Sequence, residues 1–300
     1  MDFLGEKNFP VLGLDQALQL MVEQKLPHYS TVITIDDGWY SIKSCAHRIL
    51  SEKSFPYTIY LTSYYSMKET PIFNLVVQFM FWKTKKDHFN VAALGTSMSG
   101  IYSLSDPVSL DKAIQKIIEY GHSNLDNPGR CALAKRLGEY LRVDYAEIEK
   151  SRILTLLTMN DIKKLSADGV DFQLHSHRHQ WPLEKQAALR ELSENEVFLK
   201  HLTGKASQHF CYPSGIWSYE QLPYLVEAGI KSATTTLEEI NYPGTTPLHL
   251  LRRFVDRESK SQIKFEAEMT GYMHILRKIQ SSLSVGKGNL SQKRKNLHNT

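Results

Sequence analysis

The sequence predicts an α/β protein built on a parallel β-sheet with helices packed around it. A β-branched strand at residues 30–35, a helix at 44–51 and a second strand at 57–61 follow one another at the spacing of a βαβ unit. Three polar motifs each follow a different predicted strand. In barrels and open parallel sheets the carboxyl ends of the strands form the active site, so we expect these motifs to meet there.

The other elements are predicted from the spacing of apolar residues and from the residues that begin and end helices. Expected in chain order are helices at 14–23, 158–168, 183–202 and 219–228, and strands at 170–174, 209–212 and 232–236. Pro27 ends the first helix, and Gly229 closes the last one. For the second helix the expected N-cap is Asn160, and the expected end is Gly169.

Between about residues 64 and 155 the alternation of strands and helices stops, and helical segments such as 110–120 and 131–141 appear instead. We therefore expect one domain over residues 1–280 that carries a helical insertion at about 64–155. Insertions after the strands of a barrel often shape a substrate cleft. The longest apolar stretch, residues 72–82, is shorter than the roughly 20 residues that a membrane span needs.

The charge balance narrows the classes of partner. The 300 residues include 36 basic and 32 acidic side chains, which give a formal net charge of +4. Residues 281–300 hold the whole excess, so residues 1–280 carry 32 charges of each sign. This balance does not favour a nucleic-acid partner. We expect residues 281–300 to form a disordered basic tail, with weak attraction to an anionic membrane surface as the alternative.

The cysteine content bears on the compartment. Cys45, Cys131 and Cys211 form an odd and sparse set, which gives no disulfide framework and suits a reducing environment. The first residues show no charged-then-apolar leader. The expected location is therefore cytoplasmic.

The first motif places two adjacent carboxylates, Asp36 and Asp37, at the end of an apolar run and before Gly38 and Trp39. Neighbouring side chains on an extended backbone point in different directions, so one carboxylate can bind a metal ion while the other faces a water molecule. A carboxylate that is not a ligand is a natural general base. The alternative is a solvated Asp-Asp-Gly turn.

The second motif places His175 and His179 four residues apart, with His177 between them. Residues at this spacing share one face of a helical turn, where two imidazoles can bind one ion. Two imidazoles and a carboxylate suit a catalytic Zn²⁺, although Co²⁺, Ni²⁺ and Mn²⁺ also accept such ligands. The alternative is a cluster of exposed histidines on a loop.

The third motif is the turn Tyr212-Pro213-Ser214-Gly215, which follows a predicted strand. Proline fixes the backbone and glycine permits an unusual dihedral angle, so the Ser214 N–H can be presented to a developing oxyanion. Taken by itself this sequence is an ordinary turn. Trp39 and Trp217 lie near the motifs, where they suit either stacking against a sugar or ordinary core packing.

In this order, the three motifs resemble those of the polysaccharide deacetylase family, the NodB-homology domain of carbohydrate esterase family 4. The family pattern T-F-D-D-G corresponds to residues 34–38, H-[S/T]-x-x-H to residues 175–179, and R-x-P-x-G to residues 211–215. The resemblance covers most of residues 28–65 and 155–256. It implies a distorted, incomplete (β/α) barrel and a hydrolase that removes the acetyl group from an N-acetylated amino sugar.

The resemblance also implies roles for individual residues. Asp37, His175 and His179 would bind a divalent metal ion, most simply Zn²⁺, and Asp36 would be the base. Ser214 would donate its backbone N–H to the tetrahedral intermediate. Trp39 and Trp217, with Tyr212 and Pro213, are the expected contacts with a carbohydrate.

Two positions depart from the family pattern. Cys211 stands where the family has an arginine beside the base, and Arg253 or the adjacent Arg252 is expected to replace it from another strand. His249 is the candidate general acid, although its spacing from Leu248 differs by one residue from the family's L-x-H pattern.

Three functions remain open from the sequence. A cytoplasmic deacetylase would act on a nucleotide-linked, lipid-linked or small oligosaccharide rather than on finished external polymer. The alternatives are a catalytically weak carbohydrate-binding relative and a metal-dependent amidase or deformylase that acts on a non-sugar amide.

Overall fold

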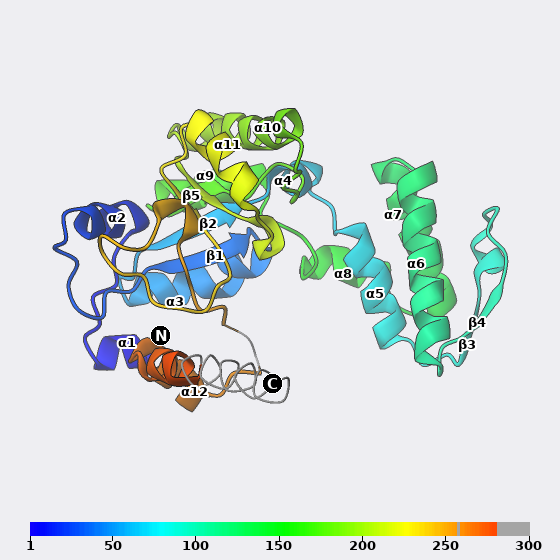
Figure 1. The fold of residues 1–300 in the computed structure, drawn as a ribbon. Coiled ribbons are helices and arrows are strands. Elements are labelled where there is room, and N and C mark those ends of the chain that lie inside the picture. The colour runs from blue at the N-terminus through cyan, green and yellow to red at the C-terminus, as the bar shows by residue number, and fades with distance from the viewer. Residues whose placement is uncertain (257–258, 281–300) are drawn as a thin grey trace, which may run out of the picture.

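A curled parallel sheet forms the centre of the computed structural model, which describes residues 1–256 and 259–280 (Figure 1). Its five strands lie side by side in the order β1 (Ile33–Asp37), β2 (Tyr57–Leu61), β5 (Asp171–Leu174), β6 (His209–Cys211) and β7 (Ser232–Thr234). All four strand pairs are parallel. The predicted fold class, a distorted and incomplete (β/α) barrel, is confirmed.

The register of the strands brings the motifs to one edge. Asp37 pairs with Leu61, and Leu61 pairs with Leu174, which directly precedes His175. On the other side of β5, Cys211 pairs with Thr234 at the end of β7. The carboxyl ends of all five strands therefore face the same side.

Strand β1 differs from its prediction. The expected strand ended before the two carboxylates, but the pairing with β2 continues through Asp36 and Asp37. The carboxylates are thus the last two residues of a strand, not part of a solvated turn. Gly38 follows with a φ of 90°, and a Cβ at this position would lie 2.7 Å from Leu61 Cδ1. Glycine is therefore required for the chain to turn here.

Helices surround the sheet and cover its apolar residues. They are α1 (Asp2–Glu6), α2 (Leu14–Val22), the π-helical η1 (Ile42–Ala46), α3 (His47–Glu52), α4 (Ser63–Lys68), α9 (Met159–Ala167), α10 (Lys185–Thr203), the short turn η4 (Tyr219–Gln221), α11 (Leu222–Glu227) and α12 (Gln262–Met269). The main core lies between the sheet and these helices, and Ile59, Phe210 and Leu225 in it are fully buried. Burial of such a side chain stabilises the fold by about 1.5–3 kcal/mol.

The start of α9 corrects one detail of the sequence analysis. The N-cap is Thr158, whose hydroxyl accepts from the Asp161 N–H, while the Asp161 carboxylate accepts from the Thr158 N–H. This reciprocal pair is a capping box, which satisfies two backbone donors at once. Asn160, the predicted cap, lies inside the first turn.

The segment between β2 and β5 folds mostly into helices. It contains α5 (Phe73–Lys83), α6 (Pro107–Asn124), α7 (Asn127–Leu141) and α8 (Tyr145–Ser151), with a hairpin of β3 (His88–Asn90) and β4 (Ile101–Ser103) beside the short η2 (Val91–Leu94). Aspartates cap α6 and α7, and a proline lies in the first turn of each.

This helical segment has an apolar core of its own. Val77, Met80, Phe89, Ile117 and Leu133 are buried in it. The α5–α7 helices and the hairpin extend to one side of the sheet in Figure 1. The sequence predicted the helices at 110–120 and 131–141 but assigned no element to α5 or to the hairpin. The division of the chain into one domain with an insertion stays a prediction.

The two ends of the helical segment meet. The Ile72 N–H donates to the Leu154 carbonyl oxygen at 2.8 Å, just before α5 begins and just after α8 ends. From there the chain runs beside the first motif, where Trp39 and Leu156 form an antiparallel bridge. Within the described residues, none of the helices has the length and apolar character that crossing a bilayer requires. The predicted basic tail, residues 281–300, lies outside the described residues.

Candidate active site

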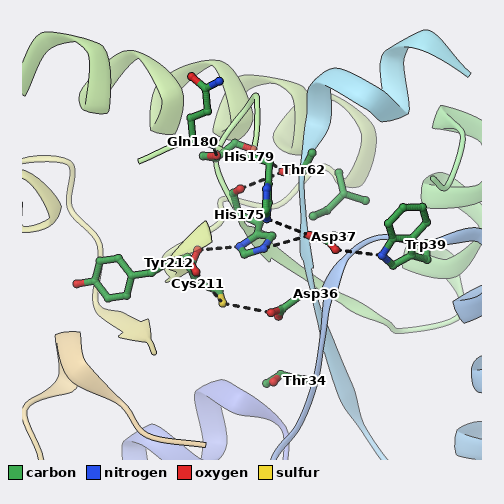
Figure 2. Close-up of polar contacts among 12 residues, drawn as sticks. Thr34, Asp36, Asp37, Trp39, Thr62, His175, His179, Gln180, Cys211 and Tyr212 are labelled. Carbon is green, nitrogen blue, oxygen red and sulfur yellow. Dashed lines mark hydrogen bonds and ion pairs between the residues drawn. The ribbon is translucent and has the colours of Figure 1, made fainter. Parts of the chain in front are cut away.

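The first two motifs meet at the carboxyl edge of the sheet. Asp37 Oδ1 lies 3.3 Å from His175 Nε2 and 3.3 Å from His179 Nε2 (Figure 2). The two imidazole rings are 4.9 Å apart between centroids. A carboxylate from β1 and two imidazoles from the loop after β5 therefore converge on one point.

The backbone reaches this arrangement through left-handed residues rather than through a helical turn. The chain from His175 to Gln180 is an irregular loop, so the helical spacing inferred from the sequence is wrong. Ser176 has a φ of 62° and His179 a φ of 58°. Asp37 and Ser214, in the other two motifs, have φ values of 65° and 57°. Such conformations cost on the order of 1–3 kcal/mol each for residues other than glycine, and they cluster at functional sites.

The orientation of the His175 ring is fixed by a hydrogen bond from Nδ1. Nδ1 lies 2.8 Å from the Cys211 carbonyl oxygen, which can only accept, so Nδ1 carries a proton and donates it. The other ring nitrogen, Nε2, faces Asp37 Oδ1 at 3.3 Å. The His175 side chain is almost completely buried, and this hydrogen bond orients the ring.

A buried asparagine of α10 positions the histidine loop. Asn195 is 0 % exposed, and its Oδ1 accepts from the His175 N–H at 2.9 Å. Its Nδ2 donates to the Leu61 carbonyl oxygen and to the Ser63 hydroxyl, both at 3.1 Å. Asn195 therefore connects β2, α4 and the loop in one network. The sequence analysis missed it, and the available signal was an amide within the amphipathic helix predicted at 183–202.

The middle of the loop is fixed by Glu191, which is also buried on α10. Its carboxylate accepts from the Arg178 N–H at 2.6 Å and from the Arg178 guanidinium at 2.8 Å, and its carbonyl accepts from the His177 N–H at 3.1 Å. His177 Nδ1 lies 2.8 Å from the Ser63 hydroxyl, so this ring is turned toward α4 rather than toward Asp37.

Asp36 is paired with Arg253. The guanidinium donates to Oδ1 at 2.8 Å and to Oδ2 at 2.5 Å, and its Nε donates to the Thr235 carbonyl oxygen at 3.0 Å. Two parallel hydrogen bonds of this kind are among the strongest in proteins. The neighbouring Arg252 pairs with Glu239 instead. Of the two arginines considered from the sequence, Arg253 is the one that reaches the carboxylate.

Cys211 occupies the place beside this ion pair. Its Sγ lies 3.6 Å from Asp36 Oδ2 and 3.2 Å from the Arg253 guanidinium. Burial alone would raise the pKa of Asp36, but the hydrogen bonds and charge of Arg253 outweigh it, and the pKa is lowered. Asp36 is therefore ionised at neutral pH and can accept a proton.

The third motif forms a rigid turn. Gly215 has a φ of 70°, and a Cβ there would lie 2.1 Å from Thr236 Oγ1, so no other residue fits without displacement. Pro213 is buried, while Ser214 is exposed in the short 3₁₀ segment η3 (Pro213–Gly215). The assignment of the Ser214 N–H as an oxyanion donor stays a prediction.

Three residues that were predicted to belong to the site are used elsewhere in the fold. Tyr212 is 1 % exposed, its ring points away from the carboxylates in Figure 2, and its hydroxyl donates to the His249 carbonyl oxygen at 3.0 Å. Tyr212 and the buried Pro213 therefore belong to the core rather than to a substrate surface. His249 Nε2 is 2.7 Å from the Ile230 carbonyl oxygen, before β7 begins, so the ring faces the opposite end of the strand.

The tryptophans differ in their surroundings. Trp217 is half-buried and packs with its ring 6.2 Å from that of Tyr212, so it contributes to the core beside the third motif. Trp39 is half-buried, and its indole N–H donates to Asp37 Oδ2 at 3.0 Å. The sequence analysis considered sugar stacking or core packing for Trp39 but did not foresee this hydrogen bond.

Comparisons with known proteins find similarity in sequence and in fold. A family model described as Polysaccharide deacetylase matches residues 134–233, a range that includes the second and third motifs. The first motif lies outside that range. In the structure its Asp37 is 3.3 Å from the two histidines of the second motif.

Over residues 134–233 the chain is similar to the polysaccharide deacetylase family.

Solved structures share the fold of this chain at low sequence identity. The Streptococcus pyogenes deacetylase PplD, solved in complex with acetate, has a TM-score of 0.55 and 14 % identity, with 89 % of this chain and 82 % of that chain covered. IcaB from Ammonifex degensii has a TM-score of 0.54 and 14 % identity, with coverage of 89 % and 85 %. A de-N-acetylase from Aggregatibacter actinomycetemcomitans has a TM-score of 0.53 and 11 % identity, with coverage of 89 % and 86 %. No curated protein matches the sequence significantly.

The donor set of the candidate site fits a divalent cation. One oxygen of Asp37 and one nitrogen each of His175 and His179 lie within 4.8 Å of one another. A second group, Asp36, His175 and Cys211, has similar spacing. However, the Arg253 guanidinium contacts both Asp36 and the Cys211 sulfur, and its positive charge opposes a cation there. The first group is therefore the better candidate metal site.

Proposed function

We propose that the protein is a metal-dependent N-deacetylase that hydrolyses the acetamide of an N-acetylated amino sugar. The acceptor would be an oligo- or polysaccharide, or a lipid- or nucleotide-linked precursor. One observation carries the proposal: Asp37 lies 3.3 Å from each of two imidazoles, and Asp36, held by Arg253, is a separate carboxylate beside them. A metal site with an adjacent ionised base is what hydrolysis of an amide requires.

In this proposal Asp37, His175 and His179 hold a divalent ion, with Zn²⁺ preferred over Co²⁺, Ni²⁺ or Mn²⁺. When bound, such an ion lowers the pKa of a water molecule and polarises a carbonyl group. Asp36 takes a proton from water as the water oxygen bonds to the acetamide carbon. The pairing with Arg253 keeps Asp36 ionised before this step and fixes its direction.

The later proton transfer follows from the same residues. The Ser214 N–H would donate to the oxygen of the tetrahedral intermediate. As the carbon–nitrogen bond breaks, the leaving amine takes the proton that Asp36 has received, and acetate is released. Because the His249 ring is bonded to a carbonyl oxygen at the far end of β7, we assign the acid step to Asp36 and not to His249.

The identity of the sugar is a separate question. Burial of Tyr212 and Pro213 removes two of the four expected carbohydrate contacts, which keeps a metal-dependent amidase or deformylase on a non-sugar amide as the second candidate. A catalytically weak relative is less favoured, because Arg253 supplies the partner of the base that Cys211 does not. A cytoplasmic location, which stays a prediction, would favour a sugar precursor over external polymer.

The first test separates the base from the metal ligands. Asp36→Asn should retain the metal and lose about 10²–10⁴-fold in turnover, since general base catalysis contributes about that factor. Acetate release from N-acetylglucosamine oligomers and from nucleotide-linked N-acetyl sugars is measured beside formate release from formylated peptides. Near-normal acetate release by the variant would refute the assignment of Asp36. Activity on the formyl substrates alone would favour the second candidate.

The second test concerns the ligands. His175→Ala should lose its metal on dialysis, as measured by elemental analysis, because one of three protein donors is removed. His201→Ala is the matched control, since His201 is exposed in the last turn of α10. Full metal retention by His175→Ala would contradict the proposed site.

A further inference from the structure

The two oxygens of Asp37 have different partners. Oδ1 faces His175 and His179 at 3.3 Å, whereas Oδ2 accepts the Trp39 indole N–H at 3.0 Å (Figure 2). An indole N–H donates a hydrogen bond and cannot accept one or bind a metal ion. The carboxylate therefore has one oxygen directed toward the cation site and one oxygen directed away from it.

Trp39 is held in place by its backbone. The Leu157 N–H donates to the Gly38 carbonyl oxygen at 2.7 Å, and the Tyr40 N–H donates to the Thr155 carbonyl oxygen at 3.0 Å. These bonds lie on either side of the antiparallel bridge between Trp39 and Leu156. The Trp39 side chain thus projects from a short paired segment rather than from a free loop.

The neighbours of this segment add further restraint. The Arg152 guanidinium lies 3.8 Å from the centroid of the Tyr40 ring and donates to the Asp161 carboxylate at 2.7 Å. Arg152 follows α8, the last helix of the helical segment, and Asp161 belongs to the capping box of α9. The position of Trp39 is therefore tied to the point where the chain returns from the helical segment to the sheet.

We propose that Trp39 is a positioning residue that restricts Asp37 to coordination through one oxygen. Carboxylates bind metal ions through one oxygen or through both. Engagement of Oδ2 by the indole N–H leaves Oδ1 for the ion, so positions on the ion stay open for water and substrate, as catalytic sites require. This inference rests on the proposed role of Asp37 as a metal ligand. It assigns Trp39 to the metal site and not to the stacking of a sugar.

The test removes the indole N–H of Trp39 and keeps an aromatic side chain at this position. Trp39→Phe is compared with the unchanged protein by titration with Co²⁺ and by the visible absorption of the bound ion. The variant should bind Co²⁺ about 10–100-fold more weakly, the usual cost of removing a partner of a ligand. The visible absorption of the bound Co²⁺ should also weaken and shift, because Asp37 Oδ2 can then bind the ion and raise its coordination number. Trp82→Phe is the control, since Trp82 is exposed on α5, and it should change neither quantity.

The outcomes distinguish this inference from the proposed function. If the unchanged protein and His175→Ala bind Co²⁺ equally, the metal site itself is wrong. If the unchanged protein binds Co²⁺ through His175, but Trp39→Phe has the same affinity and spectrum, only the role of Trp39 is overturned.

A second measurement covers the case in which Trp39→Phe does not fold. In the unchanged protein labelled with ¹⁵N-tryptophan, the four indole N–H signals are assigned by substituting the other three tryptophans one at a time. The Trp39 proton should exchange with solvent more slowly than the Trp82 proton. An equally fast exchange would mean that the hydrogen bond to Asp37 does not persist in solution, and the inference would fail.

Discussion

Replacement of Arg253 by methionine should destabilise the protein and impair the base together. The side chain donates two hydrogen bonds to Asp36 and one to the Thr235 carbonyl oxygen, and it is 16 % exposed. Methionine keeps much of the side-chain volume and removes the charge. Removing one partner of a buried ion pair leaves an uncompensated charge, which typically costs about 3–5 kcal/mol.

The pH dependence has a definite sign. In the intact protein the pKa of Asp36 is lowered, because Arg253 outweighs the effect of burial. That stabilisation is present above the unfolded pKa of about 3.9 and is lost as the pH falls through the folded value. In Arg253→Met the effect of burial is opposed only by the charge of His175 and no longer by Arg253, so the pKa of Asp36 rises. The stability deficit should then be largest at neutral pH and shrink by at most about 1.4 kcal/mol per unit as the pH falls.

Urea unfolding of metal-free protein at pH 7 and pH 5 measures this deficit, and the pH profile of acetate release measures the base. The acidic limb of the profile should move to higher pH in Arg253→Met. Arg252→Met is the matched control, because Arg252 pairs at the surface with Glu239, and such pairs contribute about 0–1 kcal/mol. An equal loss of stability in both variants, with no shift of the acidic limb, would refute the reasoning.

Two further variants test the supports of the site. Asp161→Asn should cost about 3 kcal/mol at pH 7, because buried Asp161 accepts from Lys43 at 2.5 Å and from Arg152 at 2.7 Å. Burial would raise the pKa of Asp161, but these bonds lower it far below its usual value. The deficit measured in urea should therefore be constant near neutral pH and shrink progressively as the pH falls from about 3.9 toward the folded pKa. A deficit that is independent of pH would argue against the ion pairs as its source. Asn195→Ala should cost about 2–3 kcal/mol and weaken metal retention, since the His175 N–H loses its buried acceptor. Unchanged stability in urea would show that the network around Asn195 is dispensable.

The strands were predictable where an apolar run has clear limits. The predicted strand at 57–61 coincides with β2, all of whose residues are buried. The run that became α5 was not assigned, because a continuous apolar stretch without clear periodicity does not distinguish a helix from a strand. Strands β3 and β4 have three residues each, too few for alternation to be seen.

The convergence of the candidate ligands was predictable from the sequence, but the backbone geometry that produces it was not. The carboxylate and the two imidazoles meet as expected, yet the spacing of His175 and His179 suggested a helical turn that does not exist. The left-handed residues Ser176 and His179 are stabilised by the surrounding structure and not by local propensity. Arg253 was considered only because Cys211 stands where the family pattern has an arginine. Its approach to Asp36 depends on the pairing of Leu251 with Thr234, which is a tertiary contact.

The junction of Ile72 with Leu154 means that entry to and exit from the helical segment occur at a single narrow stem. A segment with such a stem and an apolar interior of its own can be replaced by a short linker, or by an unrelated module, while the strands on either side keep their pairing. Among the described residues, the contacts that such a replacement would have to keep include the bridge between Trp39 and Leu156 and the Arg152 guanidinium against the Tyr40 ring.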